Sequence, residues 1–248
     1  MHRFFVDGKQ IHENIIEIVG KDVKHIKDVL RLKPSDIIEI SSGGWVYICE
    51  ILEIKPDLVV GKVVESFKGK SEPPIHITLY QGIAKGDKMD YIIQKATEIG
   101  VREIYPLTTN RTVVKIKNKK KEKSKIDRWN TIAEEAAKQS KRDYVPRVQR
   151  IINFEEMLKL LKGNQNIIVP YEIEESFSLK DSLNKIKSGK VHLIIGPEGG
   201  FEKEEIDLLK SIGGQSITLG PRILRTETAG LVAASIILYE LGDLGVMK

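Results

Sequence analysis

The sequence contains one cysteine, Cys49, among its 248 residues. A single cysteine forms neither an intramolecular disulfide nor a cysteine metal cluster, and the five histidines show no metal-ligand spacing. The sequence therefore implies no metal. Cys49 lies in a strand-like apolar segment, residues 46–51, and is predicted to be a small hydrophobic residue of a core.

Long apolar runs are also lacking. The longest run near the C-terminus, residues 231–238, is too short to span a bilayer, and the first residues lack the apolar stretch of a signal peptide. These absences predict a cytoplasmic protein without a membrane partner.

Two widespread nucleotide-binding motifs are missing as well. No G-x-G-x-x-G stands at the end of an expected strand, and no G-x-x-x-x-G-K-[ST] occurs. A phosphate cradle is therefore disfavoured.

Charge is present but unevenly placed. The formal net charge is +5, and residues 1–70 hold 11 basic and 11 acidic side chains, so the basic excess lies in the remainder. Residues 111–125 form an expected loop with seven lysines. This loop is either an ordinary solvated segment or an arm that contacts RNA phosphates, in which case Lys119, Lys120 and Lys121 are candidates.

Hydrophobic patterning divides the chain into two domains, residues 1–70 and 71–248, joined by a linker around 67–74. The first contains a helical pattern over 22–32 and several short strands, which are typical of a small β-barrel. In the second, strands alternate with helices, and this alternation predicts an α/β fold with a largely parallel sheet covered on both faces. Its expected helices include residues 154–161, which a capping signal of Asn153 and Glu156 opens, and residues 179–186.

The last helical pattern, residues 227–241, is apolar nearly all round. A helix of this kind must be buried on every side, which a homodimer interface would accomplish as easily as a core.

Two loops near the C-terminus form the candidate site. The expected strand 191–195 runs into G-P-E-G-G, residues 196–200, and the strand 216–219 runs into a second glycine-proline loop. Gly199 and Gly200 are expected to take positive φ and to let a ligand approach the main chain. Crevices beyond the carboxyl ends of strands are the usual binding sites of α/β sheets, so both loops are predicted to face one ligand.

These loops also carry a family resemblance. The segments I-I-G-P-E-G-G-F and L-G-P-R-I-L-R-T-E-T-A resemble the signature of the RsmE family, methyltransferases of the SPOUT superfamily that methylate N3 of a uridine in small-subunit ribosomal RNA. Residues 25–36, 85–101 and 128–142 match as well, so the resemblance covers nearly the whole chain.

The resemblance implies a PUA-like RNA-binding domain in residues 1–70 and a SPOUT methyltransferase domain in residues 71–248. It implies a deep C-terminal trefoil knot, which topology rules alone would reject. It also implies S-adenosyl-L-methionine as cofactor, 16S ribosomal RNA or the small ribosomal subunit as substrate, and a homodimer.

The loops and the resemblance together provide candidate residues. Those for binding the cofactor are Gly196, Pro197, Glu198, Gly199, Gly200, Leu219, Gly220, Ile223, Leu224, Arg225, Thr228 and Ala229. Candidates for RNA contacts besides the lysines are Arg31, Arg128, Gln139 and Arg142, of which Gln139 and Arg142 are expected to share a helix face.

Arg225 is the first candidate for a chemical role. It stands just ahead of an expected helix N-terminus opened by Thr226 or Thr228, where an arginine gains nothing from the helix dipole. This position indicates an anionic partner, either RNA or Glu227; the alternative is a structural ion pair with Glu198 or Glu227. These two carboxylates are candidate proton acceptors if burial raises their pKa.

Two other functions remain open at this point. The chain could be a SPOUT methyltransferase that acts on another RNA position, such as a ribose 2′-hydroxyl, because a fold does not determine a substrate. It could also be a noncatalytic RNA-binding factor in ribosome assembly, although an intact cofactor motif argues against that.

Overall fold

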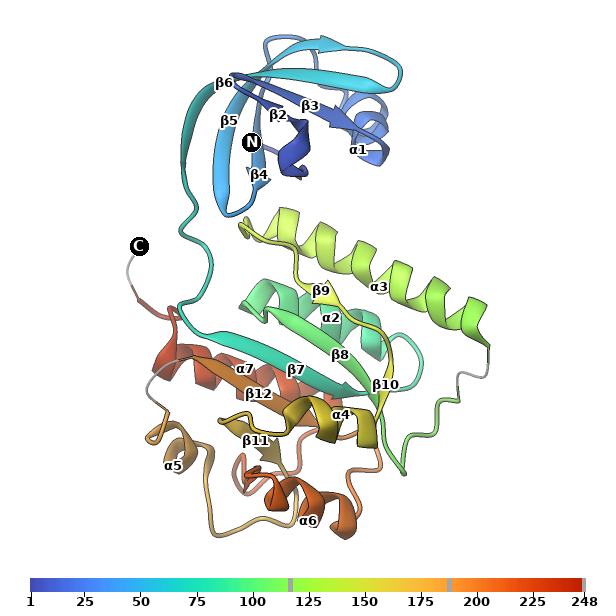
Figure 1. Ribbon diagram of the computed structural model, residues 1–248, viewed down its shortest axis with the longest axis vertical. Coiled ribbons are helices and arrows are strands. Elements are labelled where there is room, and N and C mark those ends of the chain that lie inside the picture. Colours follow the sequence, from blue (N-terminus) through green and yellow to red (C-terminus); the bar gives the residue numbers. More distant parts are fainter. Residues whose placement is uncertain (116–117, 187–188, 247–248) are drawn as a thin grey trace. The chain divides into compact units, whose positions relative to one another are not determined.

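The computed structural model of the protein describes residues 1–115, 118–186 and 189–246 (Figure 1). The chain forms two compact units, which are described separately. The first contains Met1–Glu72 and Ala137–Val145, and the second contains Pro73–Ala136 and Pro146–Lys248. The short segment 137–145 of the first unit was not foreseen in the sequence.

The first unit is built on a six-stranded sheet with the order β1-β4-β5-β6-β3-β2. The pairing of β1 with β4 is parallel, and its other pairings are antiparallel. Because β6 continues to Lys68, the linker begins later than predicted. The strands are β1 (Arg3–Phe5), β2 (Ile11–His12), β3 (Ile15–Val19), β4 (Ile37–Ser42), β5 (Trp45–Ile54) and β6 (Leu58–Lys68).

The helical segment of this unit is shorter than the predicted helix over 22–32. A 3-10 helix, η1 (Gly8–Gln10), precedes a turn of α-helix, α1 (Lys21–Lys24), and a π-helix, η2 (His25–Val29). The prediction was wrong in its C-terminal part, because Arg31 takes a left-handed backbone conformation with φ of 54° that no helix continues through.

Isoleucines from three strands, β3, β4 and β5, and from η2 dominate the core of the first unit, together with Phe4 and Val23. Cys49 lies in this core with 0% exposure, and burial raises the pKa of its thiol to about 12. The prediction of a small hydrophobic core residue is therefore confirmed.

Polar contacts hold residues 137–145 in the first unit. Asp143 is 3% exposed, and its carboxylate accepts hydrogen bonds from Arg3 Nη1 at 3.1 Å and from the Ser71 amide at 2.8 Å. Gly69 allows this approach, because a Cβ there would lie 2.2 Å from Asp143 Cγ. These contacts join residues about 70 and 140 positions apart in the sequence, which local patterns do not reveal.

The second unit contains a parallel sheet with the order β10-β8-β7-β12-β11-β13, and β9 pairs with β8. All described pairings in it are parallel, which confirms the predicted α/β fold. Its strands are β7 (His76–Gly82), β8 (Glu103–Thr108), β9 (Arg147–Val148), β10 (Ile152–Asn153), β11 (Ile167–Pro170), β12 (Lys190–Ile195) and β13 (Gln215–Ile217).

Two boundaries among the helices differ from the predictions. The lysine-rich stretch is not all loop, since α3 already begins at Lys119, and lysine favours helices. The helix expected over 179–186 ends at Leu183. The helices are α2 (Lys88–Ile99), α3 (Lys119–Gln139), α4 (Phe154–Leu161), α5 (Leu179–Leu183), α6 (Lys203–Ser211) and α7 (Thr226–Leu241).

Helices cover both faces of this sheet (Figure 1). Tyr80 and Ile194 pack in one cluster with Met157 of α4 and Leu209 of α6. The alternate residues of the same strands face α7, where a Cβ on Gly230 would lie 3.4 Å from Ile195 and 3.9 Å from Leu79. The central strands are therefore buried on both sides, as their continuous apolar sequence requires.

Candidate cofactor-binding and catalytic site

A cavity of about 930 Å³ lies beyond the carboxyl ends of β11, β12 and β13. All predicted cofactor residues except Thr228 are among the described residues that line it; Thr228 lies exposed on α7. The two C-terminal loops therefore meet at one cavity, as the sequence predicted.

Glycines shape the first loop, although not all as expected. Gly200 has a φ of 67°, whereas Gly199 is not among the glycines with positive φ, so that part of the expectation was wrong. The loop also presses against Gly82 at the end of β7, where a Cβ would lie 2.3 Å from the Pro197 nitrogen. The sequence analysis missed Gly82, which lies just before the 85–101 block of the family resemblance.

Thr226 ties the two loops together. Its hydroxyl donates a hydrogen bond of 2.6 Å to the carbonyl oxygen of Gly196 and accepts one of 2.9 Å from Gln81 Nε2. Gln81 is 0% exposed and Thr226 is 7% exposed, so water does not compete for these bonds. The end of β7, the end of β12 and the start of α7 are thereby held in one arrangement.

Lys88, which the sequence analysis missed, joins the two candidate carboxylates. Its Nζ lies 3.5 Å from Glu198 Oε1 and 3.2 Å from Glu227 Oε2. The Lys88 ammonium thus offsets part of the negative charge of Glu198 and Glu227. Lys88 also lines the cavity. Its place within the matching block 85–101 was the signal that could have found it.

The environment of Glu198 does not suit a proton acceptor. Burial alone would raise the pKa of Glu198, but hydrogen bonds from the backbone amides of Lys85 and of Glu198 itself, with the charge of Lys88, lower it below the ordinary value. The condition for a base at neutral pH, a pKa raised by burial, is thus not met.

Arg225 occupies the N-cap position of α7 and is exposed on the cavity wall. Within the described part of the chain it has no ion-pair partner. The structural alternative, a bridge to Glu198 or Glu227, is therefore wrong, because Lys88 takes both carboxylates. An unpaired guanidinium beside a cavity is placed to meet an anionic group of a ligand.

A segment after β11 adds carboxylates that the sequence analysis did not single out: Glu172, Glu174 and Glu175 line the cavity. Hydrogen bonds from the hydroxyls of Ser176 and Ser216, and from the Ser176 amide, lower the pKa of Glu174 to about 2. This carboxylate is therefore ionised at neutral pH and contributes negative charge to the wall.

The candidates for RNA contacts are dispersed. Lys119, Lys120 and Lys121 are exposed on the first turn of α3, while Ile116 and Lys117 lie outside the described residues. Arg31 and Gln139 are also exposed, and both belong to the first unit; Gln139 is the last residue of α3.

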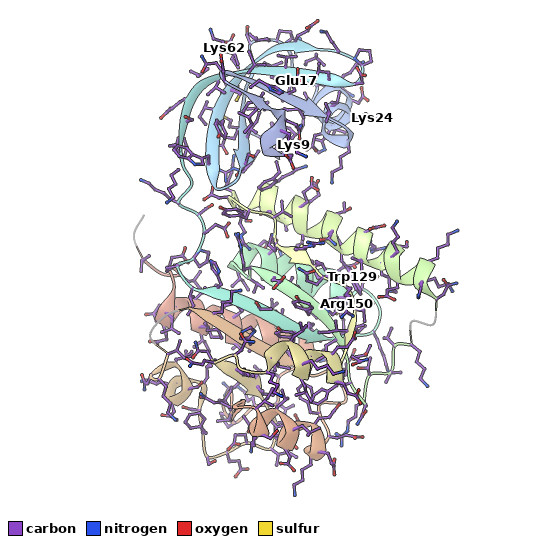
Figure 2. The ribbon with its side chains drawn as sticks, viewed as in Figure 1. Lys9, Glu17, Lys24, Lys62, Trp129 and Arg150 are labelled. Carbon is purple, nitrogen blue, oxygen red and sulfur yellow. The ribbon has the colours of Figure 1, made fainter. Side chains whose placement is uncertain are left out.

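Two arginine candidates are engaged within the protein. Arg128 pairs with Asp90, which also accepts a hydrogen bond of 3.1 Å from Nε1 of Trp129, labelled in Figure 2. Arg142 is 2% exposed and pairs with Glu72 at 2.6 Å. Its expected place on a helix face with Gln139 was wrong, because α3 ends at Gln139, and its burial argues against an RNA contact.

Comparison with known proteins agrees with these observations. Residues 71–238 match a family model described as an RNA methyltransferase domain, and residues 18–64 match one described as an RNA methyltransferase PUA domain. The chain is 37% identical to ribosomal RNA small subunit methyltransferase E of Bacillus subtilis (strain 168), with 97% of each chain covered. The chain belongs to this methyltransferase family.

Other members have the same extent and fold. The ribosomal RNA small subunit methyltransferase E of Mesomycoplasma hyopneumoniae (strain 232) is 34% identical over 93% of this chain and 96% of its own. The enzyme of that name from Neisseria gonorrhoeae, solved bound to S-adenosyl methionine, superposes with a TM-score of 0.87, at 29% identity over 98% of this chain and 99% of its own. The family resemblance and the SPOUT-type α/β fold with a PUA-like domain are thus confirmed, while the trefoil knot stays a prediction.

Proposed function

We propose that the protein transfers the methyl group of S-adenosyl-L-methionine to N3 of a uridine in 16S ribosomal RNA. The observation that carries this proposal is that two loops, each at the end of a strand, line the same cavity in a chain of an RNA methyltransferase family. The cofactor of the Neisseria relative and the substrate in the relatives' names support it.

The residues of the cavity fit this cofactor. A volume of about 930 Å³ lies within the usual range for small-molecule sites, roughly 300–1,000 Å³. Backbone groups of the two loops, such as those of Leu219, offer donors and acceptors for an adenine edge and ribose hydroxyls. A Cβ on Gly220 would meet no atom within 4 Å, which leaves room for a ligand beside this residue. The carboxylates of the segment after β11 suit a ligand that carries positive charge.

When bound, S-adenosyl-L-methionine supplies an electrophilic methyl group on a sulfonium. The protein must hold the uracil nitrogen in line with that methyl group, and positioning of this kind provides much of the acceleration. As the N3 proton leaves to water, negative charge spreads over the two neighbouring carbonyl oxygens of the uracil ring. The unpaired guanidinium of Arg225 is the donor that we assign to this charge.

Glu198 is not assigned the role of a general base. Its pKa is lowered, and its carboxylate already contacts Lys88 and the backbone amide of Lys85. Its role in this account is to fix the first loop against the segment that begins α2. Glu227 pairs with the same lysine and fixes the start of α7 in the same way.

RNA binding is assigned to the exposed basic residues. Lys119, Lys120 and Lys121 present three adjacent positive charges on α3, and Arg31 and Gln139 are further exposed candidates. The PUA-like domain is assigned to RNA binding as well, on the ground of its family match, although residues 1–70 carry no net basic excess.

We also propose that the protein is a homodimer in the cytoplasm, where ribosomal RNA is found. Helix α7 is buried on one side, with Ala233 and Ile237 at 0% exposure, but Ile236 and Tyr239 on its other side are 38% and 66% exposed. A second copy would cover this apolar face. No helix of the described chain is long and apolar enough to cross a membrane.

Methyl transfer from radiolabelled cofactor to small ribosomal subunits tests the proposal. Subunits from a strain that lacks the gene should accept label, and nucleoside analysis should find it in N3-methyluridine. Label in another nucleoside would support a SPOUT methyltransferase of different specificity. Absence of label despite RNA binding would support the noncatalytic assembly factor instead.

A further inference from the structure

Arg111 is the residue through which the basic segment reaches the first cofactor loop. It lies between β8 and α3, and its Nη1 donates a hydrogen bond of 3.0 Å to the carbonyl oxygen of Gly199. Its aliphatic part runs along the same loop, because a Cβ on Gly199 would lie 3.1 Å from Arg111 Cβ. One arginine side chain thus supports the glycine pair of the cavity wall.

The backbone around Arg111 is firmly anchored. Thr112 Oγ1 accepts a hydrogen bond of 2.8 Å from the Thr109 amide, which closes a turn around Arg111. Asn110 donates from its amide to Glu205 Oε1 at 3.0 Å and from Nδ2 to Glu202 Oε2 at 2.7 Å. Glu205 is 3% exposed, so this anchor holds Arg111 against the start of α6.

Much of the guanidinium remains available. Arg111 is exposed, and in the described ranges of the chain its Nε and Nη2 have no protein partner. The planar fork of an arginine can serve a carbonyl with one nitrogen and a phosphate with the others. Lys115 and the three lysines Lys119, Lys120 and Lys121 follow Arg111 in the sequence, so Arg111 begins a basic segment.

We infer that Arg111 is a positioning residue that couples RNA binding to cofactor binding. An RNA phosphate on the free donors holds the guanidinium against Gly199, and the loop then stays in the conformation that receives the cofactor. By thermodynamic linkage, cofactor binding strengthens RNA binding by the same factor. This inference rests on the proposed function, since it needs both ligands.

Equilibrium dialysis of radiolabelled S-adenosylhomocysteine tests the coupling without turnover. The Kd is measured with and without saturating small ribosomal subunits from a strain that lacks the gene. In the wild type we expect subunits to lower the Kd about fivefold or more, the lower end of typical coupling. Arg111→Ala should abolish this change. Arg111→Lys should also lose it while it keeps most of the affinity for subunits, because an ammonium lacks the planar fork.

Arg150→Ala is the matched control, since Arg150 (Figure 2) is an exposed arginine that pairs with Glu156 away from the cavity. This control should keep the wild-type coupling. Coupling that persists in Arg111→Ala, or its absence in a wild type that binds both ligands, overturns the inference. A wild type that binds neither S-adenosylhomocysteine nor subunits contradicts the proposed function instead.

Discussion

The hydroxyl of Thr226 donates a hydrogen bond of 2.6 Å to the carbonyl oxygen of Gly196, and so joins the first residue of α7 to the residue that follows β12. This bond joins two cavity-lining residues that are 30 positions apart in the sequence. The two candidate loops cannot shift independently while this bond persists, which is why we treat them as one binding site.

Replacement of Thr226 by valine tests this connection. Valine keeps the shape but leaves the Gly196 carbonyl and one N–H of the Gln81 side chain without their partner, so we expect the free energy of unfolding to fall by about 1–3 kcal/mol. Affinity for S-adenosyl-L-methionine should fall as well. Urea denaturation and calorimetry measure the two effects. Thr226→Ser retains the hydroxyl and should restore both; a valine variant with unchanged affinity would show that the loops do not depend on each other.

Arg225→Ala should lower kcat and leave cofactor affinity largely intact. A contact made mainly to developing charge is lost from the transition state and not from the ground state. The decrease should be on the order of tenfold to a thousandfold, comparable to removal of one oxyanion donor. Steady-state kinetics with subunits as substrate measure it. If KM for the subunit rises while kcat stays unchanged, Arg225 binds RNA, and the electrostatic role assigned to it is wrong.

The triple variant Lys119→Ala, Lys120→Ala, Lys121→Ala should weaken RNA binding and flatten its salt dependence. Each lost phosphate contact removes roughly 0.7–0.9 from the slope of log K against log salt. Filter binding over a range of salt concentrations measures the slope, and kcat at saturating subunit should stay nearly constant. An unchanged slope would mean that this turn of α3 is merely solvated.

Glu174→Gln should lower stability at neutral pH and much less in acid. The folded-state pKa of Glu174 is lowered from 4.5 to about 2, so its ionised form stabilises the fold above the unfolded-state pKa, and this contribution is lost as the pH falls from about 4.5 to about 2. Urea denaturation at pH 7 and pH 3 measures the free energy of unfolding, and the variant should differ less from the wild type at pH 3 than at pH 7. Glu175→Gln, an exposed neighbour, is the control; an equal loss at both values would contradict this account.

Ile236→Glu should dissociate the proposed homodimer. A glutamate on the exposed face of α7 would carry an unpaired charge into the interface, which costs several kcal/mol. Light scattering at micromolar concentration measures the mass. Leu208→Glu, at a 49% exposed position on α6, should leave the mass unchanged. A wild type that is monomeric under these conditions would exclude the dimer.

Local signals were the most reliable part of the sequence analysis. Helix α4 occupies the predicted residues 154–161, because the capping box of Asn153 and Glu156 fixes its start and the apolar spacing continues to its end. The two glycine loops could be located for the same reason, since glycine and proline act on their own backbone. Their meeting at one cavity followed from the parallel sheet, whose strands end at a common edge.

Long-range partners could not be predicted in this way. Arg142 seemed an exposed helical residue, but the carboxylate of Glu72, 70 positions earlier, holds it in a buried ion pair. Apart from the family match of residues 85–101, Lys88 gave no sign of its role, because its two partners, Glu198 and Glu227, lie more than 100 residues later. Such contacts depend on the folded arrangement, and the hydrophobic periods that reveal helices and strands carry no information about them.

The most direct test of the central claim is hydrogen exchange of the backbone amides with and without S-adenosyl-L-methionine. If the two loops form one cofactor site, the ligand should slow exchange together in residues 196–202 and 218–225, and Thr226→Val should reduce the protection of both. Protection confined to one loop, or protection elsewhere in a protein that binds the ligand, would contradict the account.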